Sequence, residues 1–383
     1  MLFEFTEEEV LIRDTARKMA AEIVAPLAPV LDRGEGREAF LKNLRALAEA
    51  GFMAVNVRAE FGGTEAGTVA FAQVIEELGY ACAATGVTAS VTNMVAEVIQ
   101  AVGSDEQRQA YIPRIADGTY PAAGFCLTES GAGSDPAGLK PRARRDGEDF
   151  VLDGEKVYIT SAEYAGLFVV WAVTDPDAPK GKGISCFLVE AGTPGLSVGK
   201  AERKLGQHGS ATNTVHFDGC RVPATALMGR LNDGFRVAVG ELAGGRIGVA
   251  SLSLGIARAA MDAAKAYVKE RRQFGQAIAD FQGIQWMVAD RETELEAARL
   301  LILSAAAKKD RGEPFGREAS MAKLFASEAA GRATDTALQL HGGAGYCADF
   351  PAERHLRDAR ITRIYEGTSE VQRLIIARET FRQ

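Results

Sequence analysis

The chain has 383 residues, 47% hydrophobic and 25% charged, with a formal net charge of −7. This length allows two or three domains or one large unit, and the acidic balance argues against a nucleic-acid-binding protein. Five scattered cysteines without CxxC spacing and four histidines without ligand spacing argue against a disulfide framework or a zinc site. We therefore expect no metal ion and a reducing compartment.

The N-terminus does not resemble a targeting segment. Glu4, Glu7, Glu8 and Glu9 precede any long apolar run, which is unlike a secretory signal peptide. No stretch is expected to be long and apolar enough to span a bilayer. The sequence therefore predicts a cytoplasmic protein without a membrane span.

Residues 1–120 are expected to form an N-terminal helical domain. Thr6 and Glu9 have the spacing of a capping box, and Ser104 is expected to cap a later helix. The run Ala81–Val102 is rich in small residues, so it either lines an apolar pocket or packs closely against other helices. Further helical patterns cover 38–50 and 67–79.

Residues 121–228 are expected to form a compact middle β domain. The runs Phe150–Leu152 and Lys156–Thr160 flank Asp153-Gly154, which predicts a hairpin with a type I′ turn. Further β-rich runs cover 167–173, 184–189 and 214–217.

Helical periodicity returns in residues 229–383, the predicted C-terminal domain. Three long patterns with short links indicate an antiparallel bundle; they cover 234–272, 281–310 and 317–340. The order is therefore helices, β domain, helices, a mainly α chain with one β domain.

The stretch Ile364–Glu370 contains a candidate catalytic carboxylate. Glu366 precedes a helical pattern, and Ser369 and Gln372 have capping-box spacing. The free N–H groups of that helix would favour an anionic ligand group, and Glu366 beside it could remove a proton. The alternative is a surface glutamate placed favourably before a helix N-terminus.

The glycine-rich stretch Phe125–Asp135 joins the helical half to the β domain. Its glycines allow close backbone approach to a ligand, with Thr128 and Ser134 as donors. The alternative is a domain-boundary loop.

Two other patterns are weaker. Gly343–Ala348 satisfies GxGxxA, but a helical pattern precedes it where a dinucleotide-binding fold needs a strand, so we reject that interpretation. Arg271 at the end of the long helical pattern either bridges a pyrophosphate or caps the helix.

Together these stretches resemble the acyl-CoA dehydrogenase family, over essentially the full length of the chain. Residues 126–138 match its first signature in outline. The second signature is matched by 339–358, from Gln339 to Asp358, and Tyr365–Ser369 also agrees. Small residues at Gly244 and Gly245, with Glu366 as the acid, resemble short-chain and short branched-chain members.

The resemblance implies a fold and an assembly. The family has an N-terminal helical domain, a middle β-barrel or sandwich domain and a C-terminal four-helix bundle. It also implies a homotetramer, built as a dimer of dimers, in which neighbouring subunits share FAD.

The resemblance also implies the ligand contacts. Ser134, Arg246 and Gly367 correspond to acyl-CoA contacts, and Arg271, Gln282 and Gln339–Gly343 would reach the FAD of a neighbouring subunit. The full set of implied FAD residues is Phe125, Leu127, Thr128, Gly133, Ser134, Tyr158, Ile159, Thr160, Arg271, Phe274, Gln282, Gln339, Gly342, Gly343, Thr368 and Glu370.

The implied reaction is oxidation of an acyl-CoA thioester to 2,3-enoyl-CoA. Glu366 takes the α-proton while a hydride leaves the β-carbon for flavin N5, and electron-transferring flavoprotein accepts the electrons. Hydrogen bonds from the Glu366 N–H and a flavin ribityl hydroxyl stabilise the developing enolate. An apolar pocket would strengthen the base.

The chain departs from the family pattern at three positions. Gly245 stands where some relatives carry the base, which leaves Glu366 as the candidate; Tyr158 replaces a tryptophan, and Ala243 replaces an acid. Alternatives on the same fold are an acyl-CoA oxidase, an acyl-CoA desulfinase and a non-catalytic helical adaptor. The sequence does not define the acyl chain.

Overall fold

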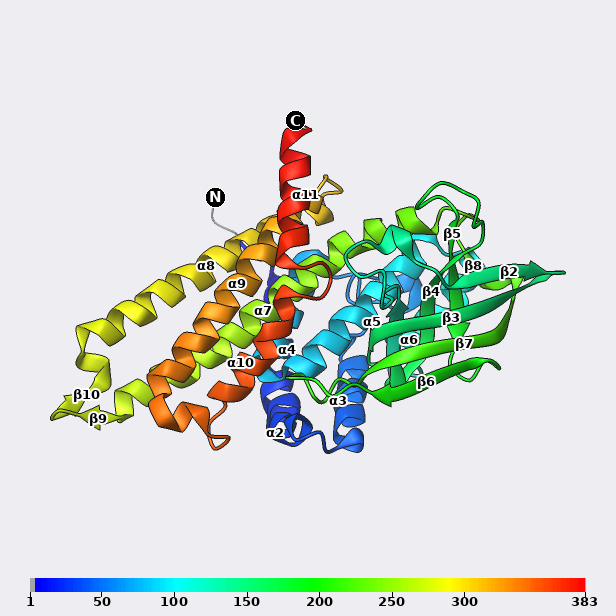
Figure 1. Cartoon of the computed structure of the whole chain (residues 1–383). Helices are drawn as coiled ribbons and strands as arrows, with labels where there is room; N and C mark the ends of the chain where they lie inside the picture. Colours follow the sequence, from blue (N-terminus) through cyan, green and yellow to red (C-terminus); the bar gives the residue numbers. More distant parts are fainter. Residues whose placement is uncertain (1–3, 383) are drawn as a thin grey trace.

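The computed structural model describes residues 4–382, except the side chain at position 241, so residues 1–3 and 383 of the expected outer domains lie outside it. Figure 1 shows a sheet-rich region on one side of an elongated helical part. The predicted order of helices, sheet and helices is confirmed.

The N-terminal region is helical, as predicted. Glu9 N donates to Thr6 Oγ1 at 3.1 Å, and Gln107 N donates to Ser104 Oγ at 3.2 Å, so both expected caps are confirmed. The helices are α1 (Glu7–Met19), α2 (Ala28–Asp32), α3 (Arg37–Glu49), α4 (Gly67–Ala81), α5 (Ala83–Val102) and α6 (Asp105–Ala116).

The middle region is one mixed sheet of eight strands. The hydrogen-bonded order is β6-β7-β3-β2-β4-β5-β8, and β1 pairs in parallel with β4. The strands are β1 (Ala122–Cys126), β2 (Arg142–Asp146), β3 (Asp149–Thr160), β4 (Ala165–Val173), β5 (Ile184–Glu190), β6 (Leu196–Ala201), β7 (Thr212–Pro223) and β8 (Leu227–Met228).

The predicted hairpin at Asp153-Gly154 is wrong. Asp153-Gly154 lies inside β3, at an irregularity in its pairing with β7. The turn is at an earlier Asp-Gly pair, because β2 ends at Asp146 and β3 begins at Asp149, with Gly147 at φ 64°. Because Asp146 pairs with Asp149, the two central residues of the turn are Gly147 and Glu148, with glycine first. Asp153-Gly154 stays inside β3 because β7 pairs beside it.

The C-terminal region contains α7 (Gly234–Glu270), α8 (Gln282–Asp310), α9 (Gly316–His341), α10 (Ala352–Arg360) and α11 (Ser369–Phe381). A small ribbon of β9 (Arg272–Gln273) and β10 (Gln276–Ala277) joins α7 to α8. In Figure 1 this ribbon lies at the end of the molecule away from the sheet, and α11 projects from the side. The long helices predicted from periodicity are confirmed.

Helix α7 corrects the expectation that no segment is long and apolar enough to span a membrane. By length and composition α7 is apolar enough to span a bilayer, but 83% of its most apolar window is buried inside the protein. It is the central helix of the fold, so its apolar composition reflects packing against other helices on several sides.

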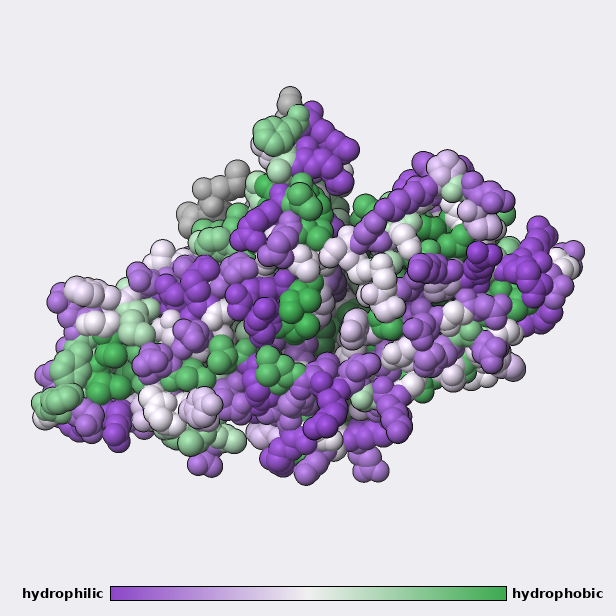
Figure 2. All heavy atoms as spheres, in the orientation of Figure 1, coloured by the Kyte–Doolittle hydropathy of each residue, from purple (hydrophilic) through white to green (hydrophobic). Residues whose placement is uncertain are grey.

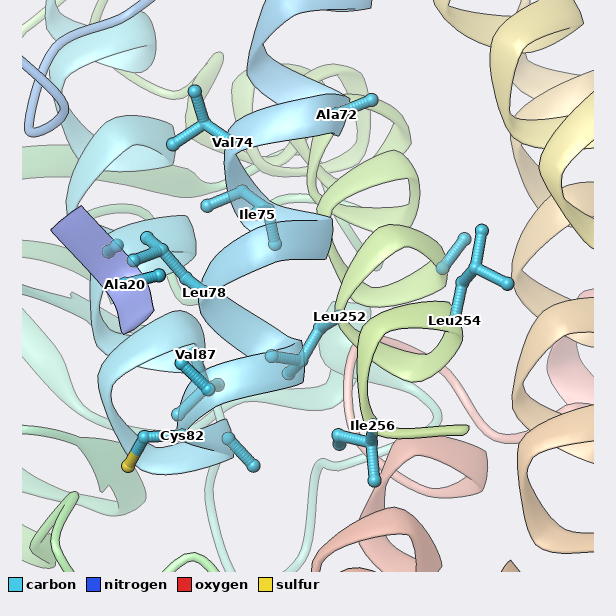
Figure 3. Close-up of a cluster of buried hydrophobic side chains, with 14 of the residues drawn as sticks. Ala20, Ala72, Val74, Ile75, Leu78, Cys82, Val87, Leu252, Leu254 and Ile256 are labelled. Carbon is cyan, nitrogen blue, oxygen red and sulfur yellow. The ribbon is translucent and has the colours of Figure 1, made fainter. Parts of the chain in front are cut away.

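Glycines let α4 and α5 approach α7 closely. A Cβ at Gly86 would lie 2.7 Å from Leu252 Cδ1, and one at Gly79 would lie 2.8 Å from Leu252 O. Figure 3 shows Leu252 reaching from α7 toward α4, among Ile75 and Leu78. The contact at Gly86 therefore supports close helix packing, rather than an apolar pocket, as the role of small residues in the run Ala81–Val102.

Candidate active site

Glu366 lies in the loop before α11 in a left-handed backbone conformation. Its φ is 52° and that of Gly367 is 92°. A non-glycine residue in this region costs about 1–3 kcal/mol, so the surroundings must hold it. Gln372 Nε2 donates to Glu366 O at 3.1 Å and to Gly367 O at 2.9 Å, and Lys323 Nζ donates to Gly367 O at 2.7 Å.

The cap of α11 differs from the prediction. Thr368 is the N-cap, with Val371 N donating to its hydroxyl at 3.3 Å. Ser369 Oγ instead donates to Glu328 at 2.7 Å, and the buried Gln372 side chain reaches back to the loop. The capping-box spacing therefore identified the helix start one residue late.

The Glu366 carboxyl group is desolvated. The residue is half-buried, but Oε2 is inaccessible and has no hydrogen-bond partner in the described part of the chain. Burial raises the pKa of Glu366 to about 7, against the opposing effects of Lys323 and Arg246. At neutral pH this group can therefore both accept and release a proton.

Gly245 of α7 faces this carboxyl group. A Cβ there would overlap Glu366 Oε2 and lie 2.8 Å from Met94 Sδ of α5. The structure thus places Glu366 directly against the position from which some relatives supply the base.

Two buried cations flank the same carboxyl group. Lys323 of α9 is 0% exposed, and Arg246 of α7 is also buried. Arg246 Nη1 lies 3.5 Å from Ser320 Oγ, and its Nε has no partner among the described residues. Burial lowers the pKa of Arg246, and the Glu366 carboxylate opposes that shift.

The glycine-rich loop after β1 is tied to β3. Val157 N donates to Thr128 O at 2.9 Å. The fully buried Lys156 donates from Nζ to Glu129 Oε1 at 2.5 Å and to Leu127 O at 3.2 Å. The two segments expected to face a flavin are therefore held together. The Lys156–Glu129 pair that holds them was not predicted from the sequence.

Tyr158 presents an aromatic surface to the outside. Its φ is 58°, its side chain is 64% exposed, and Ile159 next to it is buried. Figure 2 shows a hollow in the surface between the helical part and the sheet region, beside the base of α11. Gly133 and Ser134 lie exposed in the loop that follows Thr128.

A second group of expected cofactor residues lies elsewhere. Arg271 ends α7, and Phe274, on the turn between β9 and β10, is 93% exposed. These residues lie at the end of the helical part away from the sheet (Figure 1). The exposed Gln282 begins α8 there, and His341, between the exposed Gln339 and Gly342–Gly343, stacks on Tyr267 near the end of α7. One chain does not bring this group together with Thr128 and Tyr158.

Among residues 4–382, no group of three or more His, Cys, Asp or Glu side chains could hold a metal ion.

Family models match nearly the whole chain. The N-terminal domain of acyl-CoA dehydrogenase matches residues 6–119, its middle domain residues 124–220, and its C-terminal domain residues 232–381. The chain belongs to the acyl-CoA dehydrogenase family. The resemblance seen in the sequence is thereby confirmed, and the chain is an enzyme of this flavoprotein family.

Two curated relatives match this acyl-CoA dehydrogenase along its length. The acryloyl-CoA reductase (NADH) of Anaerotignum propionicum is 42% identical over 386 residues, covering 100% of this chain and 97% of the relative. The mitochondrial short/branched chain specific acyl-CoA dehydrogenase of Rattus norvegicus is 42% identical over 376 residues, covering 98% and 86%.

Two solved structures have the same fold and cover 100% of both chains. Butyryl-CoA dehydrogenase from Megasphaera elsdenii matches with a TM-score of 0.95 at 35% identity. A structure described as the electron transferring flavoprotein of Acidaminococcus fermentans matches with a TM-score of 0.96 at 40% identity.

The residues present fit the flavin of an acyl-CoA dehydrogenase. Tyr158 offers an exposed ring, as a planar ligand requires, and its neighbour Val157 is hydrogen-bonded through the backbone to Thr128. At Gly342 and Gly343 a Cβ would meet nothing within 4 Å, so the backbone is open to a ligand or a partner. Thr368 and Glu370 lie at the start of α11, where free N–H groups favour phosphate.

Three residues of the site were not foreseen as functional. Lys323, Lys156 and Glu129 are buried and charged. Lys323 and Lys156 sit in ordinary helical and strand patterns, and Glu129 lies in the glycine-rich loop after β1. The one signal for Lys323 was its position among alanines at helical spacing, on what must be the buried face of α9.

Proposed function

We propose that this enzyme oxidises an acyl-CoA thioester to the 2,3-enoyl-CoA, with Glu366 as the base and FAD as the cofactor. The observation that carries the proposal is a carboxyl group with a buried, unpartnered oxygen and a pKa of about 7 beside a surface hollow. A base of this strength is matched to neutral pH.

The chemical difficulty is the weak acidity of the α-carbon. Glu366 removes the α-proton, and the electron pair of the C–H bond remains on the substrate, where the thioester oxygen carries the developing charge. The backbone N–H of Glu366 donates to no acceptor among the described residues, so it is available to the thioester carbonyl. Such preorganised donors stabilise an enolate-like transition state.

FAD, when bound, supplies the acceptor for the β-hydride. The residues that would hold it in one chain are Phe125, Leu127, Thr128, Gly133, Ser134, Tyr158, Ile159, Thr160, Thr368 and Glu370. The remote group at Arg271, Phe274, Gln282, Gln339, Gly342 and Gly343 would complete the site of a neighbouring subunit. Ser134, Arg246 and Gly367 would contact acyl-CoA.

Two partners follow from this arrangement. The distance between the two groups of cofactor residues in one chain supports a homotetramer, a dimer of dimers that shares FAD between subunits. Electron-transferring flavoprotein is the proposed electron acceptor, supported by the similar structure described under that name.

The proposed acyl group is short. On the α7 face beside Glu366, a Cβ at Gly245 would meet Met94, and a Cβ at Gly248 would meet Ser90 and Phe71, so α4 and α5 leave little room beside α7. Relatives named for acryloyl, butyryl and short or branched acyl groups agree with this assignment.

The test is Glu366→Gln in the holoenzyme. The amide keeps the size of the side chain but cannot take the α-proton, so flavin reduction by butyryl-CoA should fall by about 10²–10⁴-fold while FAD content is retained. Stopped-flow absorbance at the flavin band measures the rate. Glu379→Gln on α11, a half-buried position whose carboxylate pairs with Arg378 and Arg382, is the matched control. Undiminished reduction by Glu366→Gln would end the assignment.

The pH dependence has a defined sign. Because only ionised Glu366 accepts the proton, kcat/KM should rise with pH through an apparent pKa of about 7 and then level off. The raised pKa also means that the folded state holds a proton which the unfolded state releases near pH 4.5. Between those pH values this group lowers stability as pH rises, and Glu366→Gln should remove that contribution from the melting temperature.

A second candidate is the same reaction in reverse, saturation of a 2,3-enoyl-CoA. The acryloyl-CoA reductase relative favours it. In that direction protonated Glu366 would return the proton to the α-carbon, as microscopic reversibility requires. Comparing the initial rates of butyryl-CoA oxidation and crotonyl-CoA reduction with the same enzyme separates the two.

A further inference from the structure

Lys323 is an unusual residue at this site because its side chain is wholly buried. It is 0% exposed, on the face of α9 that turns toward α7 and the loop before α11. Lysine is rarely buried without a partner of opposite charge. Its ammonium group has three N–H donors, and the acceptor found among the described residues is Gly367 O at 2.7 Å.

The charged surroundings of Lys323 point to Glu366 as its counter-ion. Burial lowers the pKa of Lys323 to about 8, and the Glu366 carboxylate is the strongest of the effects that oppose this shift. The reciprocal influence appears at Glu366, where Lys323 is the first group that opposes the rise in pKa. The charged groups around this pair are Arg246 of α7, Glu328 of α9, and Glu370 and Arg378 of α11.

We propose that Lys323 is a positioning residue for proton abstraction: it fixes the Gly367–Thr368 peptide, directly after Glu366, and favours the ionised form of the Glu366 carboxyl group. The inference rests on the proposed function and names a residue beyond it. Lys323 binds the carbonyl of Gly367, next to the left-handed Glu366, so it holds the strained backbone that aims the base.

The same ammonium group acts on the charge of the base. A desolvated carboxylate loses its proton readily only when a positive group is near, and Lys323 provides that charge from the side of α9. Arg246 adds a second positive group from α7, so one carboxylate lies between two cations. As the α-proton moves to Glu366, negative charge develops on the substrate. The positive charges of Lys323 and Arg246 stabilise this anionic transition state.

Gln372 offers a matched comparison. Its side chain donates to the same carbonyl, Gly367 O, at 2.9 Å, and to Glu366 O at 3.1 Å. It is buried like Lys323 but carries no charge. Lys323→Met removes one hydrogen bond to the loop and Gln372→Met removes two, but only the first substitution removes a positive charge.

The experiment measures kcat/KM for butyryl-CoA against pH in FAD-loaded wild type, Lys323→Met, Gln372→Met and Glu366→Gln. Lys323→Met should shift the rising, acid side of the kcat/KM profile to higher pH by about 1 to 3 units, because it removes an opposite charge. It should also lower kcat/KM at pH 7 at least about 10-fold. Gln372→Met should lower kcat without shifting the acid side of the profile. A Lys323→Met profile that overlays wild type overturns the proposal.

Three further results each have one meaning. If Lys323→Met does not fold, Lys323→Arg takes its place: a lower kcat with an unshifted acid side of the profile supports the proposal, and an unchanged kcat overturns it. If Glu366→Gln remains active, the proposed function itself fails. If Glu366→Gln is inactive while Lys323→Met behaves as wild type, only the role of Lys323 fails.

Discussion

At the scale of single residues, the site depends on the absence of a side chain as much as on the presence of one. Glu366 keeps its desolvated position because Gly245 leaves room for the carboxyl group between α7 and the loop before α11. In the sequence, Gly245 is a departure from the family pattern in which the base lies on this helix. The structure gives the steric counterpart, since a side chain at 245 and the carboxyl group of Glu366 would occupy the same space.

Gly245→Ala should therefore impair catalysis more than folding. The added methyl group would overlap Glu366 Oε2 and press on Met94, so we expect at least a 10-fold loss in the rate of flavin reduction and about 1–3 kcal/mol of destabilisation. Stopped-flow reduction by butyryl-CoA and the melting temperature measure the two effects.

Gly240→Ala is the control in the same helix. Gly240 is exposed, and a Cβ there would meet nothing within 4 Å. It should leave the rate unchanged and stabilise the helix by about 0.5–1 kcal/mol. Equal rates for Gly245→Ala and wild type would show that the carboxyl group is not confined by position 245.

At the scale of elements, the C-terminal end of α8 supports the N-terminal end of α4. Thr68 N donates to Asp310 Oδ1 at 2.6 Å and Val69 N to Asp310 Oδ2 at 3.0 Å. A carboxylate at this point satisfies two N–H groups at the start of α4 and meets the positive end of its dipole. One side chain thus joins the N-terminal helices, which pack beside the site, to the C-terminal bundle.

Asp310→Ala should lower stability by about 1–2 kcal/mol, the usual cost of losing a helix cap. Asp310→Asn keeps a hydrogen-bond acceptor without the charge, so it should lose less stability than Asp310→Ala. The melting temperatures of the FAD-loaded proteins, compared at one protein concentration, measure the difference. Equal melting temperatures for Asp310→Ala and wild type would show that the contact between α8 and α4 adds nothing to stability.

At the scale of the whole molecule, the two groups of proposed FAD residues lie far apart in one chain. Thr128 follows β1 and Tyr158 lies on β3, in the sheet region, whereas Arg271 and Phe274 lie at the β9–β10 end of the bundle (Figure 1). This end also exposes Trp286 and Tyr346. Large exposed aromatic side chains gathered in one region are typical of an interface.

Phe274→Asp should weaken both the assembly of the proposed homotetramer and its binding of FAD. The charge would be buried at the subunit interface without a partner, so we expect a shift to smaller species in light scattering and a loss of bound flavin on gel filtration. Leu11→Asp, a similarly exposed apolar position on α1, is the control and should change neither. A Phe274→Asp protein with unaltered mass and flavin content would contradict the shared-site arrangement.

Much of this protein is determined by local sequence. The caps at Thr6 and Ser104, the three long C-terminal helices and the order of helices and sheet all follow from spacing and turn chemistry within a few residues. The carboxylate at 366 was also visible, because the motifs around it are contiguous. Such features are short-range, so a single sequence contains them.

The tertiary structure alone decided which Asp-Gly pair turns, why α7 is so apolar, and which groups hold the base. Gly154 pairs with Phe217 of β7 and stays in a strand, whereas Gly147 lies between the paired Asp146 and Asp149 and turns the chain. Lys323 meets Gly367 across 44 residues of sequence, and nothing local marks that lysine as different from one at the surface. The charge state of Glu366 depends on groups that only folding brings together, because desolvation and electrostatic contact are properties of distance in space.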